Sequence, residues 1–276
     1  MSIWHVNGTP LGDRQGLIIG ILNTGPESFF DGDTIENETN LVRRALTLYD
    51  DGADIVEVGG QTTRPGYKEN GLELTVESEV ERTIPIIEAI KLARPDALVA
   101  IDTYKYEVMV AAIKAGVDII NDVNGFADDP RKLPLIATSE VGILTMWNPR
   151  GKEINDVKNS LFDWAVENLS VLEVAGVNRN RILIDPGIGY AKDSRVQHDL
   201  AIMRHVDVLQ ELNRPVLVAV SNKGWAGQLL GLAKRERTAI SLVAAQSMMQ
   251  SGARVLRVHD VKETRNMLRL LAEIES

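Results

Sequence analysis

Residues 17–23 read Leu-Ile-Ile-Gly-Ile-Leu-Asn, an aliphatic run that stops at a polar amide. Runs of the same character recur along the 276-residue chain, and each is followed by small or polar residues. Nearly continuous apolar runs of this length are typical of parallel β-strands that are covered on both faces. The sequence therefore predicts eight buried strands: Leu17–Leu22, Ile55–Val58, Leu98–Ile101, Asp118–Ile120, Gly142–Met146, Ile182–Ile184, Val216–Val220 and Val255–Val258.

The segments between the predicted strands have a different period. The clearest case is the stripe of Met267, Leu270, Leu271 and Ile274, which has the spacing of an amphipathic helix. Strands that alternate with helices predict an α/β fold, and eight such units favour a (β/α)8 TIM barrel, with residues 1–276 as one domain. An open doubly wound sheet, which usually has about five or six strands, is the alternative.

A short segment precedes the first predicted strand. Residues 1–16 contain the pair Asn7-Gly8 close to Trp4 and Val6. Asn-Gly between short apolar stretches favours a tight β-hairpin. We expect this hairpin to close the bottom of the barrel.

Composition limits the classes of function. The net charge is -9 and the pI is near 5.1, and Lys and Arg do not cluster, which argues against a surface for nucleic acid. The chain has no cysteine, which excludes disulfides and thiolate chemistry. Neither a secretion signal nor a membrane-spanning run is visible. We therefore expect a cytoplasmic protein whose partners are small molecules, without nucleic acid or membrane.

Polar side chains follow nearly every predicted strand. Because the carboxyl ends of barrel strands form one mouth, these side chains should converge. Two of the connections, residues 24–32 and 59–66, are long and contain Gly and Pro, which suggests lids. The polar residues at the strand ends are Asn23, Thr63, Arg64, Asp102, Asn121, Asp122, Asp185, Ser221, Asn222, Lys223, Arg257 and His259.

Taken singly, these residues are more typical of helix caps and turns than of catalysts. Burying all of them without partners would be costly, so their convergence points to a polar ligand. Asp102, Asp185 and Asn121 can accept hydrogen bonds from the amino and ring N–H groups of a heterocycle. Lys223 can donate to a ring carbonyl. The pattern predicts a ligand shaped like a pterin or a purine.

Donors at the same strand ends suit a diphosphate. Arg64 and Arg257 can bind phosphate oxygens through paired hydrogen bonds, and Asn23 and His259 can add further donors. No complete dinucleotide-binding fingerprint and no P-loop motif accompanies them. The sequence therefore predicts a heterocycle and a diphosphate in one mouth, without a nicotinamide or nucleoside triphosphate site.

In order and spacing, seven stretches resemble the dihydropteroate synthase family, and together they cover nearly the whole chain. They are Gly20-Ile-Leu-Asn23, Gly59-Gly60 with Thr63-Arg64-Pro65-Gly66, Ile101-Asp102-Thr103, Ile119-Ile-Asn121-Asp122, Asp185-Pro-Gly-Ile-Gly189, Lys223, and Arg257-Val-His259-Asp260-Val261. The resemblance implies a TIM-barrel transferase of folate biosynthesis. Such an enzyme joins 6-hydroxymethyl-7,8-dihydropterin diphosphate to para-aminobenzoate and releases diphosphate, and the family commonly forms homodimers through outer helices.

The resemblance also implies roles for single residues. The pterin is held at the positions of Asp102, Asn121, Asp185, Lys223 and Arg257. The diphosphate and a Mg²⁺ ion are held at the positions of Asn23, Arg64, Arg257 and His259. Asn23 is the metal ligand among them, and Thr63 is a further substrate-binding position. The catalytic positions are Asp102, Lys223 and Arg257.

The chain departs from the family pattern in places. It has Gln61-Thr62 where the family reads Glu-Ser, and Asn222 and Gly224 where the family reads Arg and Ser. These changes leave a second hypothesis open, a pterin-binding paralogue with weak or no synthase activity or a different acceptor. A third is a Schiff-base enzyme that uses Lys223, which would need a lowered pKa for that lysine. We expect the surrounding acids to keep Lys223 charged instead.

Overall fold

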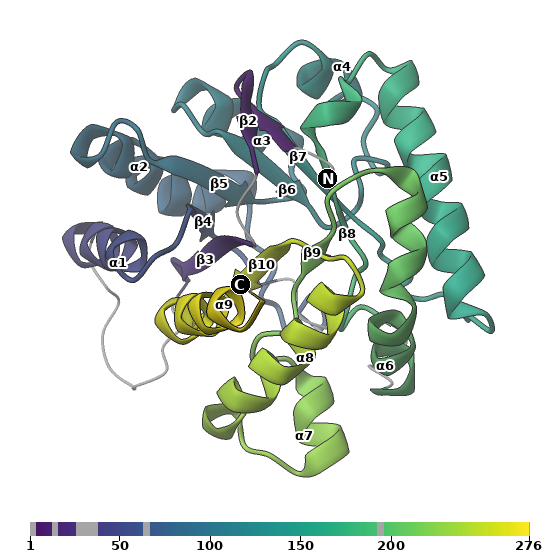
Figure 1. Ribbon diagram of the computed structural model, residues 1–276. Helices are drawn as coiled ribbons and strands as arrows, with labels where there is room; N and C mark the ends of the chain where they lie inside the picture. The colour runs from purple at the N-terminus through teal and green to yellow at the C-terminus, as the bar shows by residue number, and fades with distance from the viewer. Residues whose placement is uncertain (1–3, 13–15, 26–37, 63–66, 192–195, 276) are drawn as a thin grey trace.

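The computed structural model describes residues 4–12, 16–25, 38–62, 67–191 and 196–275, and its centre is one eight-stranded parallel sheet (Figure 1). The strand order is β8-β7-β6-β5-β4-β3-β10-β9, and its two ends meet, because the Ile184 N–H donates to the Pro215 carbonyl at 3.0 Å and Ile184 bridges Val216. This closure confirms the predicted TIM barrel and excludes the open sheet. The strands of the barrel are β3 (Leu17–Asn23), β4 (Ile55–Gly59), β5 (Leu98–Asp102), β6 (Ile119–Asp122), β7 (Gly142–Met146), β8 (Ile182–Asp185), β9 (Leu217–Val218) and β10 (Val255–Val258), and a separate hairpin consists of β1 (Trp4–Val6) and β2 (Thr9–Leu11).

Helices surround the barrel on its outside (Figure 1). Two of them have side-chain caps at their N-termini: Thr75 accepts from the Ser78 N–H at 3.2 Å, and Asp156 accepts from the Asn159 N–H at 3.0 Å. Within the described ranges, no helix is both long and apolar enough to cross a bilayer. The helices are α1 (Glu38–Asp50), α2 (Val76–Ala93), α3 (Tyr106–Lys114), α4 (Lys132–Ala137), α5 (Val157–Val174), α6 (Val196–His205), α7 (Gly224–Leu230), α8 (Thr238–Gln250) and α9 (Val261–Glu275).

Half of the stripe predicted for α9 is correct, because Met267 packs against the core and Leu271 is half-buried, whereas the other two residues face solvent. Leu270 and Ile274 are 61% and 69% exposed, and the side chains buried on this helix are Val261, Thr264 and Leu268. Periodicity identified the helix correctly. It misplaced two of the four residues, because large apolar side chains also lie on the solvent face.

One inward-facing side chain from each strand contributes to an apolar layer inside the barrel. Successive side chains of a strand point to opposite faces, so only alternate residues face the barrel axis. The neighbours Val56 and Ile120, for example, pack between the barrel and the helices instead. The layer, which also packs against Trp4 and Val6, consists of Ile19, Ile55, Ala100, Ile119, Leu144, Leu183, Leu217 and Val255.

The hairpin of β1 and β2 lies below this layer. Asn7 and Gly8 have φ angles of 48° and 74°, the left-handed pair that a type I′ turn requires. Trp4 Nε1 donates to the Arg181 carbonyl at 2.8 Å, and Asn7 Nδ2 donates to Asp118 Oδ1 at 2.7 Å. Both partners precede the first residue of a strand, so the hairpin covers the amino ends of the strands, opposite the polar mouth.

Replacing the buried indole should test the contribution of the hairpin to stability. Trp4 is 1% exposed, and Trp4→Ala is expected to lower the free energy of unfolding by about 3–5 kcal/mol. Trp4→Phe keeps an aromatic ring and loses the bond to Arg181, so a smaller loss of about 1–2 kcal/mol is expected. Urea unfolding measures both, and small, equal effects of the two changes would contradict the packing of this hairpin.

Candidate active site

The residues that form the floor of the mouth can be found by counting along each strand from the apolar layer. Two residues after each member of that layer, the side chain again faces the barrel axis. A cavity of about 430 Å³ opens above this second set, and all of its members except Glu57 line that cavity. The set consists of Ile21, Glu57, Asp102, Asn121, Met146, Asp185, Ala219 and Arg257.

Arg257 lies at the centre of the polar side chains on the floor. Its Nη2 lies 2.7 Å from Asp102 Oδ2, and its Nε donates to Glu57 Oε1 at 2.5 Å. The other oxygen of Glu57 accepts from Asn121 Nδ2 at 2.9 Å. One guanidinium therefore serves two carboxylates, and one of these carboxylates also fixes an amide.

Two oxygens of this group have no hydrogen-bond partner among the described residues. Asp102 Oδ1 and Asn121 Oδ1 are buried atoms, and both residues line the cavity. Buried acceptors without partners are rare, so these two indicate where a ligand with N–H groups would bind. Burial raises the pKa of Asp102 to about 7 despite the opposing charge of Arg257, and Glu57 and two further carboxylates add to the rise.

Asp185 and Lys223 form the opposite side of the cavity. Asp185 Oδ1 accepts from the Gly187 N–H at 2.8 Å, and Lys223 Nζ donates to the Ile188 carbonyl. Burial raises the pKa of Asp185 against the charge of Lys223. Burial also lowers the pKa of Lys223 and outweighs Asp185 and Asp199, which raise it. The acids thus favour the charged lysine, as expected, but burial has the larger effect on its pKa.

The rim of the cavity carries the residues predicted for the diphosphate. Asn23 and His259 both line the cavity, and the Nδ1 of His259 lies 3.0 Å from Ser221 Oγ. Thr63 and Arg64 lie outside the described residues, as do residues 26–32 of the first predicted lid. The structure thus brings together seven of the nine predicted site residues: Asn23, Asp102, Asn121, Asp185, Lys223, Arg257 and His259.

The sequence analysis missed Glu57. The run Ile55–Val58 was treated as uniformly apolar, although Glu57 interrupts it. Counting by two from Ile55 would have placed Glu57 at the same inward level as Arg257. A carboxylate inside an otherwise aliphatic strand is the signal that was available.

Asp199 and Arg237 were also missed, and both line the cavity. Asp199 is 3% exposed and accepts from the Gly189 N–H at 2.7 Å. Arg237 donates to the carbonyls of Asn222 and Lys223 at 3.4 and 3.2 Å, so it braces the turn that carries the lysine. These residues lie far from strand ends in sequence, and no local motif marks them.

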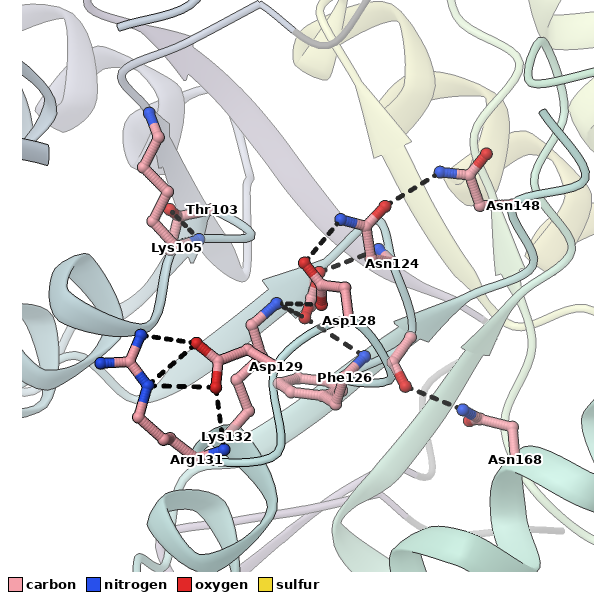
Figure 2. A network of polar contacts seen from close by, with 12 residues as sticks. Thr103, Lys105, Asn124, Phe126, Asp128, Asp129, Arg131, Lys132, Asn148 and Asn168 are labelled. Atoms are coloured by element: carbon pink, nitrogen blue, oxygen red, sulfur yellow. Dashed lines mark hydrogen bonds and ion pairs between the residues drawn. The ribbon is translucent and has the colours of Figure 1, made fainter. Parts of the chain in front are cut away.

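Asp122 belongs to a separate network behind the mouth, of which Figure 2 shows Lys132, Asn124, Phe126 and Asp128. Lys132 is fully buried, and its Nζ lies 2.7 Å from Asp122 Oδ2 and 2.5 Å from Asp128 Oδ1. Asp122 also accepts from the backbone N–H groups of Asn124 and Phe126. Burial raises the pKa of Asp122 to about 6. Asp122 therefore shapes the turn after β6 and does not line the cavity.

Residues 19–259 match the profile of the family described as "Pterin binding enzyme". The chain belongs to this family. Curated relatives are dihydropteroate synthases: one from Streptococcus pyogenes is 36% identical over 264 residues, covering 95% of this chain and 97% of the relative. One from Bacillus subtilis (strain 168) is 36% identical over 261 residues, covering 94% and 88%.

Solved structures agree with this assignment. The dihydropteroate synthase of Xanthomonas albilineans with 4-aminobenzoic acid has a TM-score of 0.90 and 34% identity, covering 100% of this chain and 98% of that one. The same enzyme in complex with 7,8-dihydropteroate has a TM-score of 0.86 and 34% identity, covering 98% and 97%. The resemblance seen in the sequence is thereby confirmed, and the chain is a transferase of the dihydropteroate synthase type.

In the wild type, ionisation of Asp102 should lower the free energy of unfolding as pH rises, and Asp102→Asn should remove this effect. The pKa of Asp102 rises from its ordinary value of 3.8 to about 7 in the folded chain. Between these values the folded chain keeps a proton that the unfolded chain has lost, so the contribution of Asp102 to stability falls as pH rises. The free energy of unfolding of the variant minus that of the wild type should therefore rise from about pH 4 to 7 and then level off. Urea unfolding across this range measures the difference, and a constant difference would contradict the environment assigned to Asp102.

Proposed function

We propose that this chain joins 6-hydroxymethyl-7,8-dihydropterin diphosphate to para-aminobenzoate and releases diphosphate, as in folate biosynthesis. The observation that carries the proposal is the pair of buried acceptors on the floor, Asp102 Oδ1 and Asn121 Oδ1, which find no partner in the described part of the chain. The similarity to synthases solved with 4-aminobenzoic acid and with 7,8-dihydropteroate supports the same substrates for this cavity.

The pterin ring fits the polar floor. Asp102, Asn121 and Asp185 face it with acceptors for the ring N–H and amino groups, and Lys223 offers a donor for the ring carbonyl. Arg257 holds Asp102 in place at 2.7 Å and closes one side of the floor. A neutral or anionic acceptor in a buried site gains from each N–H it pairs with, since it would otherwise remain unsatisfied.

The diphosphate takes the rim. His259 and Asn23 offer hydrogen bonds there, Arg257 adds positive charge from the floor, and Thr63 and Arg64 are proposed as further contacts. Asn23 also offers an amide oxygen of the kind that Mg²⁺ accepts. Within the described ranges no three His, Cys, Asp or Glu side chains form a metal cage. An ion held mainly by diphosphate oxygens and water, with Asn23 as one ligand, fits this donor set, and it would neutralise charge on the leaving group.

The reaction needs no protein nucleophile. The bond between the pterin methylene carbon and the diphosphate oxygen breaks, and the electron pair leaves with diphosphate. Arg257 and His259 stabilise the charge that develops on that oxygen. The ionised Asp102 stabilises the cation left on the methylene and ring. The amine nitrogen of para-aminobenzoate then attacks this carbon and loses a proton to solvent.

The acceptor is placed against the start of α7. Gly224, Gln228 and Arg237 line this side of the cavity together with Tyr190, whose ring centroid lies 5.4 Å from Lys223 Nζ. The aromatic ring and the cationic side suit a benzoate. Homodimer formation and a cytoplasmic location remain predictions; light scattering and fractionation test them.

Turnover decides between a synthase and a paralogue that only binds pterin. Purified chain with dihydropterin diphosphate and Mg²⁺ should release diphosphate and form dihydropteroate in equal amounts once para-aminobenzoate is added. An Asp185→Asn variant should bind the pterin roughly 10- to 150-fold more weakly, because a charge-assisted bond is lost. Tight pterin binding without any dihydropteroate would overturn the proposed synthase.

Magnesium should affect binding only when the ligand carries the diphosphate. We expect it to strengthen binding of dihydropterin diphosphate and to leave binding of the unphosphorylated 6-hydroxymethyl-dihydropterin unchanged, because the ion is shared with diphosphate oxygens. Calorimetry with and without Mg²⁺ measures both ligands. Equal effects on the two would place the ion elsewhere.

Restoring a hydroxyl at position 224 should improve use of the acceptor. A Cβ at Gly224 would meet only Gln228 Nε2, at 3.8 Å, so serine fits. Gly224→Ser is expected to raise kcat/KM for para-aminobenzoate roughly 2- to 10-fold, the value of one neutral hydrogen bond. The acceptor para-toluidine, which has a methyl group in place of the carboxylate and so accepts no hydrogen bond there, should gain nothing.

Restoring an arginine at position 222 is a poorer test. Asn222 has a φ of 56°, and its Nδ2 donates to Asp260 Oδ2 at 3.2 Å. Arginine would be strained in this left-handed conformation and would lose that bond. In the Gly224→Ser test, an unchanged kcat/KM for para-aminobenzoate would show that the missing hydroxyl at position 224 does not limit use of the acceptor.

A further inference from the structure

We infer that Glu57 is a positioning residue with two effects. It sets which end of the Asn121 amide, oxygen or nitrogen, meets the pterin, and it shares Arg257 with Asp102. The inference rests on the proposed pterin site and deepens it. Glu57 itself does not line the cavity, so it acts through these neighbours.

Glu57 occupies the inward level directly above the apolar layer. Along β4 it follows Ile55 by two residues, and its register partners are Ile21 on β3 and Ala100 on β5. It is 1% exposed. A carboxylate at this depth is costly unless its oxygens are paired, and both are paired here.

The pairing with Asn121 decides the direction of an amide. An amide group has a donor end and an acceptor end, whereas an ionised carboxylate only accepts. Glu57 Oε2 can therefore bond only to the Nδ2 end of Asn121, at 2.9 Å. The Oδ1 end is left buried and without a partner among the residues that the structure describes, and Asn121 lines the cavity. Glu57 thus makes Asn121 an acceptor toward a ring edge that presents N–H groups.

The pairing with Arg257 sets the charge balance of the floor. Two carboxylates, Glu57 and Asp102, share one guanidinium through its Nε and Nη2 atoms. The positive charge of Arg257 is therefore shared between Asp102 and Glu57. Without the charge of Glu57, Arg257 would favour the ionised form of Asp102 more strongly.

Other charged groups around Asp102 are fixed by their own contacts. Glu79 of α2 pairs with Lys105 at 2.6 Å, and Asp122 pairs with Lys132 at 2.7 Å. Both raise the pKa of Asp102, less than Glu57 does. Glu79 is also a buried carboxylate, 1% exposed, in an ion pair that does not touch Asn121 or Arg257. Glu79→Gln is therefore a matched control for the loss of a buried charge.

Glu57→Gln tests the inference, because it keeps the shape of the side chain and can donate as well as accept. The Asn121 amide is then free to turn and to present its NH2 group to the ring. At about pH 8.5, where Asp102 is ionised, the affinity for dihydropterin diphosphate should fall roughly 10-fold or more. The pH at which binding reaches half of its plateau, expected near 7 in the wild type, should move lower.

The double variant Glu57→Gln with Asn121→Asp exchanges donor and acceptor. The glutamine that replaces Glu57 can donate to the aspartate that replaces Asn121, and this aspartate presents an oxygen to the ring in either orientation. The double variant should recover most of the lost affinity, and it keeps the total charge of the floor if the single variant folds poorly. Glu79→Gln should change the affinity at about pH 8.5 by less than about twofold, because Glu79 pairs with Lys105 and shares no hydrogen bond with Asn121 or Arg257.

Calorimetry and urea unfolding of the four proteins separate the outcomes. Loss of affinity in Glu57→Gln with rescue in the double variant supports the inference. Wild-type affinity and an unchanged pH midpoint in Glu57→Gln would overturn it, as would an equal loss of affinity in Glu79→Gln. If the wild type itself does not bind the pterin diphosphate, the proposed function fails and the inference fails with it.

Discussion

The contact on which the site depends is the sharing of Arg257 between Asp102 and Glu57. Two buried carboxylates at the floor of the mouth would repel each other, and burying their charges would be costly. The guanidinium of Arg257 offsets the cost of burying both carboxylates, and its planar set of N–H donors holds them in defined positions. Because Glu57 is fixed, Asn121 is also fixed, and the floor presents acceptors to the cavity in set positions.

This polar floor is possible because the level beneath it is apolar and filled. Eight side chains, one from each strand, pack against Trp4 and Val6 of the N-terminal hairpin. Gly142 makes the close approach of the hairpin possible, because a Cβ at this position would lie 2.7 Å from Val6 Cγ2. The closed barrel thus places the ionisable groups of the floor at the end where the carboxyl ends of the strands meet.

Much of this arrangement could be predicted from the sequence, and the reason is periodicity. Apolar runs predicted all eight strands, and the polar residues that end them predicted seven members of the cavity wall. Glu57 was missed because a single carboxylate in an aliphatic run is hidden when the run is read as a block. Half of the stripe on α9 was misplaced, because apolar residues such as Leu270 lie on its solvent face. The balance at Lys223 depends on burial, which a sequence does not give.

The most direct test of the account is a crystal structure of this protein with 6-hydroxymethyl-7,8-dihydropterin diphosphate or a stable analogue. The account predicts the ring on the floor, with its N–H groups about 3 Å from Asp102 Oδ1, Asn121 Oδ1 and Asp185. It also predicts Glu57 beneath the ring, still bonded to Asn121 Nδ2. A ring bound elsewhere, or bound here with the Asn121 amide reversed, would contradict it.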